Sequence, residues 1–348
     1  MRVLVTGGAG FIGSSLVRML LGQGETVLNL DKLSYAGSLA SLADHLSYEF
    51  RRIDLCDAPS VDQALLEFAP EIVIHLAAET HVDRSIDAPR AFIESNVVGT
   101  YNLLHACLQY WSALGPDAAG RFRFLHVSTD EVYGSLGPNG RFSETSRYEP
   151  HSPYAATKAA SDHLARAWRH TYGLPVVVSN CSNNFGPYQY PEKLIPASIV
   201  RALTGKQIPI YGRGDNVRDW IFVDDHCAAL WAAATRGAVG ETYNIGASNE
   251  QRNIDLVRTL CGLLDELCPR SDGRSYAEQI EYVPDRPGHD FRYAIDAEKI
   301  RRELGWQPRH EWTAALRRTV EWYLANEDWW RPILNEALPA TSDSAGER

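Results

Sequence analysis

The stretch that decides the fold is VLVTGGAGFIG, residues 3–13, in which an apolar run leads directly into closely spaced glycines. The run has the β-branched composition of a buried strand, and a helix is expected to begin near Phe11. The glycines permit a tight turn, let a bound group approach the backbone, and allow close packing of the helix on the strand. They follow a G-x-x-G-x-x-G spacing at Gly7, Gly10 and Gly13. This order predicts the first unit of a parallel α/β sheet.

The alternation of short β-branched runs with longer helical segments continues through the first half of the chain. Helices are expected to begin near Phe11, Pro59, Pro89 and Pro153, and proline suits the first turn of a helix. Strands are expected at residues 3–6, 26–31, 49–53, 72–76, 122–128 and 176–179. The pattern predicts an α/β fold with a Rossmann doubly wound parallel sheet.

The second half of the chain differs in composition. From about Asn183 the spacing is irregular and rich in Pro, Gly, Tyr and Trp. We expect residues 1–182 to form the doubly wound domain and residues 183–333 a smaller mixed α/β lobe that binds substrate, with some later segments returning to the first domain. Residues 334–348 are polar and aperiodic, which predicts a disordered tail. Helical stretches are expected near residues 195–204, 224–235, 254–267 and 297–304.

Composition excludes several classes of protein. The 348 residues carry a net charge of -10, the wrong sign for a general nucleic-acid or anionic-membrane surface. Six cysteines without a C-x-x-C pair suggest neither a zinc site nor a disulfide framework, so we expect free thiols and no metal. The chain opens directly with a strand pattern, which makes a signal peptide unexpected, and no run reaches the roughly 18 apolar residues of a membrane helix. These features predict a cytoplasmic protein.

The glycine turn predicts a dinucleotide site, because a phosphate would rest on the N–H groups at the start of the helix. Asp31 ends the second strand, 18 residues after Gly13. An acid there accepts hydrogen bonds from ribose hydroxyls and repels a 2′-phosphate, which favours NAD over NADP. A simple turn is the alternative for a lone glycine pattern, but the strand before it and the acid after it favour the cofactor. Asp54 and Leu55 fall where an adenine contact would lie, although Asp54 alone could equally be a turn or cap residue.

A second motif, YAATK at residues 154–158, places a phenol and an ammonium at i and i+4 on one face of a helix. A lysine cation near Tyr154 would lower the pKa of the phenol, so that it could remove an alcohol proton near neutral pH. The alternative is a packed tyrosine beside a solvated lysine. With the glycine turn already in the chain, the position of Lys158 after the fifth strand favours catalysis. Here the sequence resembles the extended short-chain dehydrogenase/reductase superfamily.

The stretch VSTDEVYG, residues 127–134, narrows the resemblance to the dTDP-glucose 4,6-dehydratases over about residues 1–330. It follows the fifth strand, at the sheet edge where ligands of such folds bind. On their own, paired acids after a strand would be read as a charged loop. A hydrolase nucleophile at Ser128 or Thr129 is set aside because there is no G-x-S-x-G elbow. Further matching segments are AETHVDRS at 78–85, SNNFGPY at 182–188, PEKLIP at 191–196, RDW at 218–220 and DRPGH at 285–289.

The resemblance implies a redox-neutral lyase reaction on a nucleotide sugar with tightly held NAD. Oxidation at C4 makes the C5 proton acidic, water then leaves across C5 and C6, and the hydride returns to C6. The elimination needs one ionised and one protonated carboxyl group. The resemblance assigns Asp130 as acid, Glu131 as base, Thr129 as donor to the C4 oxygen, Tyr154 as base for the oxidation, and Lys158 as the group that holds the nicotinamide ribose and tunes Tyr154.

The glycine motif and the resemblance together imply a set of cofactor contacts. These are Gly7, Gly10, Phe11, Ile12, Gly13, Asp31, Lys32, Leu33, Ser34, Asp54, Leu55, Leu76, Ala77, Ala78, Thr80, Ser95, Tyr154, Lys158 and Asn184.

The resemblance also implies a substrate site in which Arg218 and Arg286 clamp the diphosphate, since bidentate guanidinium groups match it best. A surface role would be the ordinary reading of either arginine alone. The surplus acid is expected to lie away from a locally positive cleft. The other substrate contacts implied are Thr80, Thr129, Glu131, Asn183, Lys193, Leu194, Pro209, Ile210, Tyr211, Asn253, Asp285 and His289.

Three rival readings remain. An epimerase or decarboxylase of the same superfamily would share the cofactor and Y-x-x-x-K sites, but an epimerase needs no acid and base pair for elimination. A non-catalytic NAD-binding scaffold should have lost the tyrosine, lysine or paired acids, which are all present. An RNA-binding relative is disfavoured by the charge. By resemblance, we also expect a homodimer.

Overall fold

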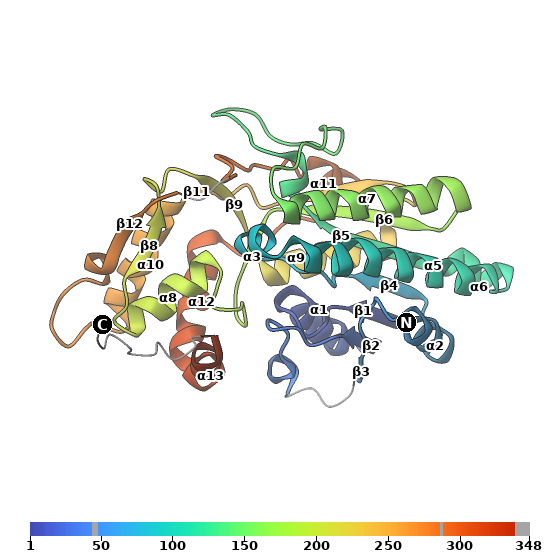
Figure 1. The fold of residues 1–348 in the computed structure, drawn as a ribbon, viewed down its shortest axis with the longest axis horizontal. Coiled ribbons are helices and arrows are strands. Elements are labelled where there is room, and N and C mark those ends of the chain that lie inside the picture. The colour runs from blue at the N-terminus through green and yellow to red at the C-terminus, as the bar shows by residue number, and fades with distance from the viewer. Residues whose placement is uncertain (44–47, 286–287, 338–348) are drawn as a thin grey trace, which may run out of the picture.

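The computed structural model describes residues 1–43, 48–285 and 288–337, and its largest element is a seven-stranded parallel sheet (Figure 1). The strand order is β10-β6-β5-β4-β1-β2-β3, so the order reverses between β1 and β4. Ligands of doubly wound sheets bind beyond the carboxyl ends of the strands at such a reversal. The strands are β1 (Arg2–Thr6), β2 (Thr26–Asp31), β3 (Glu49–Arg52), β4 (Ile72–His75), β5 (Arg123–Thr129), β6 (Val176–Cys181) and β10 (Thr242–Ile245).

Helices cover both faces of this sheet, because its strands are apolar on both sides. One face packs on α1 (Phe11–Gly22), α9 (Val223–Arg236) and α11 (Glu298–Leu304). The other face packs on α2 (Ala58–Phe68), α5 (Gly99–Ser112) and α7 (Pro153–Tyr172). Burial of these two apolar layers is the main favourable term for this part of the fold. The other helical segments of this half of the chain are η1 (Leu39–Leu42), α3 (Val82–Asp87), α4 (Pro89–Phe92), the π-helix η2 (Ile93–Val98), α6 (Pro116–Arg121) and η3 (Asp130–Tyr133).

A second hydrophobic core lies in the lobe beside the sheet, on the left of Figure 1. Its fully buried aromatic side chains include Phe185, Tyr323 and Trp330. The lobe contains a three-stranded sheet with the strand order β11-β9-β7 and a two-stranded sheet in which β12 pairs with β8. The elements are β7 (Asn183–Phe185), α8 (Leu194–Leu203), β8 (Ile208–Tyr211), β9 (Val217–Phe222), β11 (Glu250–Arg252), α10 (Asn253–Leu267), η4 (Tyr276–Gln279), β12 (Ile280–Val283), α12 (Trp312–Ala325) and α13 (Glu327–Ala337).

The predicted α/β architecture is confirmed: all six expected strands are present, and Pro59, Pro89 and Pro153 lie in the first turn of their helices. Sequence patterning missed β10, a strand of the large sheet that lies in the irregular half and pairs in parallel with β6.

The predicted start of the disordered tail is wrong for residues 334–337, which belong to α13. Leu334 packs on the second core, and this contact stabilises the last turn. The rest of the predicted tail lies outside the described residues. Among the helices that the structure describes, none is long and apolar enough to cross a membrane.

Candidate active site

A cavity of about 710 Å³ lies between the large sheet and the lobe, a typical size for a small-molecule site. It gathers nearly all the predicted residues from segments spread along the chain: the glycine turn, the ends of β2, β4 and β5, the start of α7, and the lobe. Leu33, Asp130 and Asp285 do not line it, and Arg286 lies outside the described residues. Its lining also includes Ser128, Tyr190, Glu192, Asp290 and Tyr293, which were not predicted.

The glycine turn leaves a cradle of backbone N–H groups at the start of α1. Gly7 has a φ of +74°, and a Cβ there would lie 2.7 Å from the Ala77 nitrogen. A Cβ at Gly13 would lie 2.0 Å from the Gly7 carbonyl oxygen, so a side chain cannot fit. The N-cap is Gly10, which has no side chain that could accept a hydrogen bond from the N–H groups of the first turn. A pyrophosphate fits such a cradle, because it accepts hydrogen bonds from the open N–H groups and its charge suits the helix dipole.

Asp31 is fixed at the end of β2 by two backbone donors. Ala9 N–H donates to one carboxylate oxygen at 2.9 Å, and Leu33 N–H donates to the other at 2.8 Å. Burial raises the pKa of Asp31, while these bonds act in the opposite direction. Leu33 therefore contributes its backbone, at a positive φ of 55°, and does not line the cavity.

Asp54 lines the cavity, and its side chain also accepts a hydrogen bond from Cys56 N–H at 2.9 Å. Lys32 Nζ donates to Ser95 Oγ at 2.5 Å and lies 3.1 Å from a Glu79 carboxylate oxygen. Asp54, Lys32 and Ser95 all line the cavity, as predicted for cofactor residues.

The end of β5 presents the two predicted carboxyl groups in different environments. Asp130 is 1% exposed, and its Oδ2 has no hydrogen-bond partner among the described residues. Burial raises the pKa of Asp130 well above its usual range, and the nearby Glu131 and Asp219 carboxylates raise it further. Glu131 is half-buried and lines the cavity. The arrangement therefore pairs a buried carboxyl group, whose pKa is raised, with a second carboxyl group that reaches the cavity.

Thr129 organises this turn. Its hydroxyl accepts a hydrogen bond from Glu131 N–H at 3.3 Å and lies 3.4 Å from Asp130 Oδ1, to which it donates. As the N-cap of η3, it ends the strand and starts the turn that carries both acids.

Tyr154 and Lys158 both line the cavity from the first two turns of α7. Burial raises the pKa of Tyr154 well above its usual value, and the Glu131 carboxylate raises it further, while a hydrogen bond with Thr129 lowers it. Burial lowers the pKa of Lys158. Lys158 Nζ donates to the Val127 carbonyl oxygen at 2.8 Å. The expected lowering of the phenol pKa by Lys158 is therefore wrong for the protein groups alone, because desolvation dominates.

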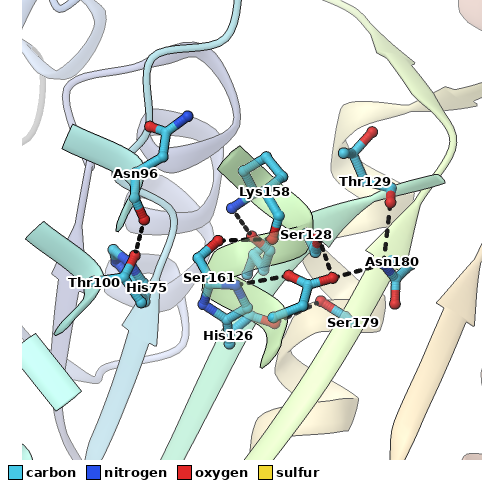
Figure 2. A network of polar contacts seen from close by, with 12 residues as sticks. His75, Asn96, Thr100, His126, Ser128, Thr129, Lys158, Ser161, Ser179 and Asn180 are labelled. Atoms are coloured by element: carbon cyan, nitrogen blue, oxygen red, sulfur yellow. Dashed lines mark hydrogen bonds and ion pairs between the residues drawn. The ribbon is translucent and has the colours of Figure 1, made fainter. Parts of the chain in front are cut away.

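A buried polar network surrounds Lys158 and the end of β5 at Thr129 (Figure 2). Ser161 donates to the Lys158 carbonyl oxygen at 2.8 Å, and Asn180 Nδ2 donates to the Thr129 carbonyl oxygen at 3.0 Å. Beside it, Asn96 in the π-helix donates to Thr157 Oγ1 at 3.0 Å and exchanges hydrogen bonds with the Glu79 backbone. Sequence reasoning missed Asn96 and Asn180, because their partners lie on other elements.

Arg218 marks the lobe end of the cavity. It is 7% exposed, donates to the Asp290 carbonyl oxygen at 3.0 Å, and lies 4.3 Å from the ring centre of Tyr293. Asp285 does not line the cavity but lies 2.6 Å from the Nδ1 of His289, which does. Asp285 is thus placed to orient His289.

The cavity is lined by side chains of both charges, so it is not positive throughout. Lys32, Lys158, Lys193, Arg201 and Arg218 line the cavity, but acidic residues line it too: Asp31, Asp54, Asp83, Glu131, Glu192 and Asp290. Positive charge in the cavity is therefore local to particular side chains, such as the buried Arg218.

The doubly wound sheet, the glycine turn and the Tyr154/Lys158 pair define an extended short-chain dehydrogenase/reductase. The family model described as GDP-mannose 4,6 dehydratase matches residues 4–319. The dTDP-glucose 4,6-dehydratase 1 of Escherichia coli K12 is 56% identical over 342 residues, covering 94% of each chain. The enzyme of that name from Neisseria meningitidis is 53% identical, covering 96% of each.

Solved structures agree with these matches. The dTDP-glucose 4,6-dehydratase of Streptomyces venezuelae, solved with NAD bound, superposes with a TM-score of 0.86 at 44% identity, covering 96% of this chain and 100% of that one. The enzyme of the same name from Bacillus anthracis, in complex with NAD, gives 0.83 at 42% identity, with coverage of 96% and 99%. The chain belongs to the dTDP-glucose 4,6-dehydratase family. The predicted family is confirmed.

Proposed function

We propose that this protein converts dTDP-glucose into dTDP-4-keto-6-deoxyglucose, acting as an NAD-dependent hydro-lyase that supplies deoxysugar biosynthesis. The observation that carries the proposal is the environment of the two acids after β5. Asp130 is buried with a raised pKa, while the neighbouring Glu131 lines the same cavity as Tyr154 and Lys158. A proton donor and a proton acceptor are thus held together beside a group suited to alcohol oxidation.

NAD fits the residues present. The cradle of α1 would hold the pyrophosphate, Asp31 would accept hydrogen bonds from the adenosine ribose, and Lys158 would donate to the nicotinamide ribose. When bound, NAD⁺ supplies a hydride acceptor for C4 and later a hydride donor for C6, so the cofactor ends as it began. The carboxylate of Asp31 would also repel a 2′-phosphate, which favours NAD over NADP.

Oxidation of the sugar requires removal of the C4 hydroxyl proton as the C4 hydride leaves. Tyr154 accepts this proton, and the Thr129 hydroxyl donates a hydrogen bond to the C4 oxygen. Since burial raises the pKa of Tyr154, the protein alone holds the phenol in its protonated form. A positive charge brought beside it by the bound cofactor acts in the direction needed to ionise it.

Elimination of water uses the two acids. Once C4 is a ketone, the C5 proton is acidic, and the Glu131 carboxylate removes it. The bond from C6 to its hydroxyl oxygen breaks as Asp130 donates its proton, so that water leaves and a C5–C6 double bond forms. Hydride addition at C6 and return of a proton from Glu131, which exchanges with solvent, to C5 complete the product. Tyr154 then releases to solvent the proton that it took from the C4 hydroxyl, and Asp130 takes one back, so all three groups recover their starting protonation states.

The diphosphate of the substrate would be bound by Arg218 and Arg286. Arg218 is well placed because it is buried, oriented by backbone carbonyl groups and stacked near Tyr293. Its fixed planar fork suits a diphosphate better than a flexible ammonium would. The remaining contacts to nucleotide and sugar would come from Asn183, Lys193, Leu194, Pro209, Ile210, Tyr211, Asn253 and His289, which all line the cavity.

The proposal includes a cytoplasmic homodimer in which the sheet domain and the lobe close on the ligands. Exposed apolar side chains on the outer side of α5 and α7 support a second copy as partner: Tyr101 is 44% exposed and Tyr172 is 51% exposed. Trp168 lies between them, with ring centres at 5.8 and 5.4 Å. Burial of such a patch would stabilise association. Sedimentation velocity of the purified chain measures this directly.

The experiment that tests the function is incubation of the purified protein with dTDP-glucose, followed by identification of the product by NMR. The expected product is the 4-keto-6-deoxy sugar nucleotide, formed without net NADH. Glu131→Gln should abolish it while leaving NAD binding intact. Formation of the C4 epimer instead, by both the parent protein and Glu131→Gln, would assign the chain the epimerase activity of other members of the superfamily.

A further inference from the structure

Asp162 is a buried carboxylate outside the predicted set. It lies on α7, one turn after Lys158 and two turns after Tyr154, so the three residues share one face of the helix. Its side chain is fully buried, and it does not line the cavity. Buried carboxylates are rare unless they are paired and hydrogen-bonded.

Asp162 is hydrogen-bonded through both oxygens. Oδ1 lies 3.0 Å from His126 Nε2. Oδ2 accepts hydrogen bonds from Ser128 Oγ at 2.8 Å and Tyr148 OH at 2.7 Å, with Asn180 Nδ2 at 3.4 Å. Although burial alone would raise the pKa of Asp162, the bond from His126 and the Lys158 and Ser128 groups bring it below the usual value. The carboxylate is therefore ionised at neutral pH.

Two of these partners lead directly to the catalytic turn. Ser128 immediately precedes Thr129 in β5, and Asn180 in β6 donates to the Thr129 carbonyl oxygen at 3.0 Å (Figure 2). Asp162 thus binds two of the groups that set where β5 ends. Its negative charge also raises the pKa of the Lys158 ammonium, against the burial that lowers it.

We propose that Asp162 is a positioning residue that acts through two others: it holds the end of β5 in the geometry that presents Thr129, and it keeps Lys158 in its ammonium form. Asp162 does not touch substrate or cofactor. The inference rests on the proposed function for the roles of Thr129 and Lys158. If the parent protein does not form the 4-keto-6-deoxy product, the function fails, whereas a parent-like Asp162→Asn variant overturns this inference alone.

The protonation of Lys158 depends on all the charged and titratable groups that face Lys158 and Asp162. The pKa of His126 is lowered by burial and then by Lys158, so this ring is neutral and does not compete as a cation. Arg166 donates to Tyr148 OH at 2.7 Å and is the second cation of the network. The other titratable groups that face the pair are His75 on β4, Cys181 on β6, Tyr133 on η3 and Tyr148.

The test is Asp162→Asn in the full chain with NAD bound. We expect kcat to fall about 10- to 100-fold, the size typical of supporting-shell residues, with KM for dTDP-glucose changed less than about twofold. Removal of the negative charge lowers the pKa of Lys158, so the alkaline limb of the pH profile should move to lower pH. NAD absorbance of the purified variant, titrated against pH, should show cofactor loss beginning at lower pH than in the parent.

Two further variants separate positioning from ordinary structural support. Asp225→Asn changes a comparably buried aspartate, 3% exposed, which binds the Arg309 and His310 backbone away from the cavity. Asp225→Asn should be less stable than the parent, but the alkaline limb of its pH profile should stay where it is in the parent. Asp162→Glu keeps the negative charge, so the alkaline limb of its pH profile should return to the parent position, although its kcat should remain below that of the parent.

The proposal is overturned if Asp162→Asn has the pH limb and kcat of the parent, or matches Asp225→Asn in both. If Asp162→Asn does not fold, Tyr148→Phe removes one donor from Oδ2 and leaves the charge in place. Its kcat should then fall about threefold to tenfold, the range that corresponds to the net contribution of one ordinary hydrogen bond, with KM and the pH limb unchanged. A parent-like kcat in Tyr148→Phe would also contradict the proposal.

Discussion

Two aspartates close to the end of β5 are equally buried and yet have opposite pKa shifts. Asp130 begins η3, directly after β5, and Asp162 lies on α7, where it accepts a hydrogen bond from Ser128 of β5. They are 1% and 0% exposed. The pKa of Asp130 is raised well above the usual range, while that of Asp162 is lowered. Burial is common to both, so it cannot be what distinguishes them.

The difference lies in the hydrogen-bond donors and in the neighbouring charges. Asp162 is bonded to His126, Ser128 and Tyr148, with Lys158 nearby. Asp130 receives one long bond from Thr129 and lies near two other carboxylates, Glu131 and Asp219. Donors stabilise the charged form, and like charges oppose it. One aspartate is thus stabilised as an anion, and the other is disfavoured as an anion, which suits the role of acid proposed for it.

The largest expected effect is on catalysis at Asp130. Asp130→Asn cannot donate the proton that the C6 hydroxyl needs, so kcat should fall about 10²- to 10⁴-fold. In the parent, the acid must be protonated, so the elimination rate should fall as pH rises through the raised pKa of Asp130. Steady-state kinetics across pH measure both effects. A variant with parent-like kcat would show that another group supplies the proton.

Replacing the two aspartates should change the free energy of unfolding in opposite directions. Asp162→Asn removes the buried carboxylate that accepts hydrogen bonds from Ser128 and Tyr148, and the free energy of unfolding should fall by about 2 kcal/mol. Asp130→Asn removes a poorly satisfied acid from the active site and should raise it by about 1 kcal/mol. Urea denaturation of both variants beside the parent gives the comparison.

The pH dependence sharpens this pair of results. Because its folded pKa is lowered, Asp162 stabilises the parent at every pH above its unfolded pKa of about 3.9, and this contribution is lost as pH falls through the folded value. Asp130 has a raised folded pKa, so its contribution is present below the unfolded pKa and is lost as pH rises through the folded value. If Asp162→Asn and Asp130→Asn changed the free energy of unfolding in the same direction at neutral pH, the contrast drawn between the two aspartates would be contradicted.

Asp31 provides a smaller and intermediate case. Two backbone N–H groups donate to it, yet burial still raises its pKa. Asp31→Asn keeps the size of the side chain but replaces one acceptor oxygen with a donor, which weakens the bonds to the ribose. The affinity for NAD should fall about tenfold, the equivalent of one charged hydrogen bond. Equilibrium dialysis measures this, and an unchanged affinity would remove Asp31 from the cofactor site.

The sequence predicts one of the two aspartates and not the other, for a physical reason. Asp130 lies in a contiguous stretch, residues 127–134, so the residues beside it in the sequence are also beside it in the site. Asp162 is visible in sequence only as a residue four positions after Lys158. Its partners come from β5, β6 and a loop, and only the pairing of those elements brings them together.

The same distinction applies to the fold. Local patterns are enough for the glycine turn and the proline-started helices, because their signals lie within a few residues. They are not enough for β10, a four-residue strand whose place beside β6 depends on long-range pairing. Nor could they show that desolvation raises the pKa of Tyr154, since burial is set by the whole cavity.

The central claim is that one site oxidises, dehydrates and reduces the same sugar. Conversion of dTDP-glucose carrying deuterium at C4 tests it most directly, with the product examined by NMR and mass spectrometry. The account predicts that the deuterium is found at C6 of the 4-keto-6-deoxy product, and that a reaction in D₂O adds solvent deuterium at C5. Deuterium retained at C4 of an epimerised sugar, or lost to solvent, would contradict it.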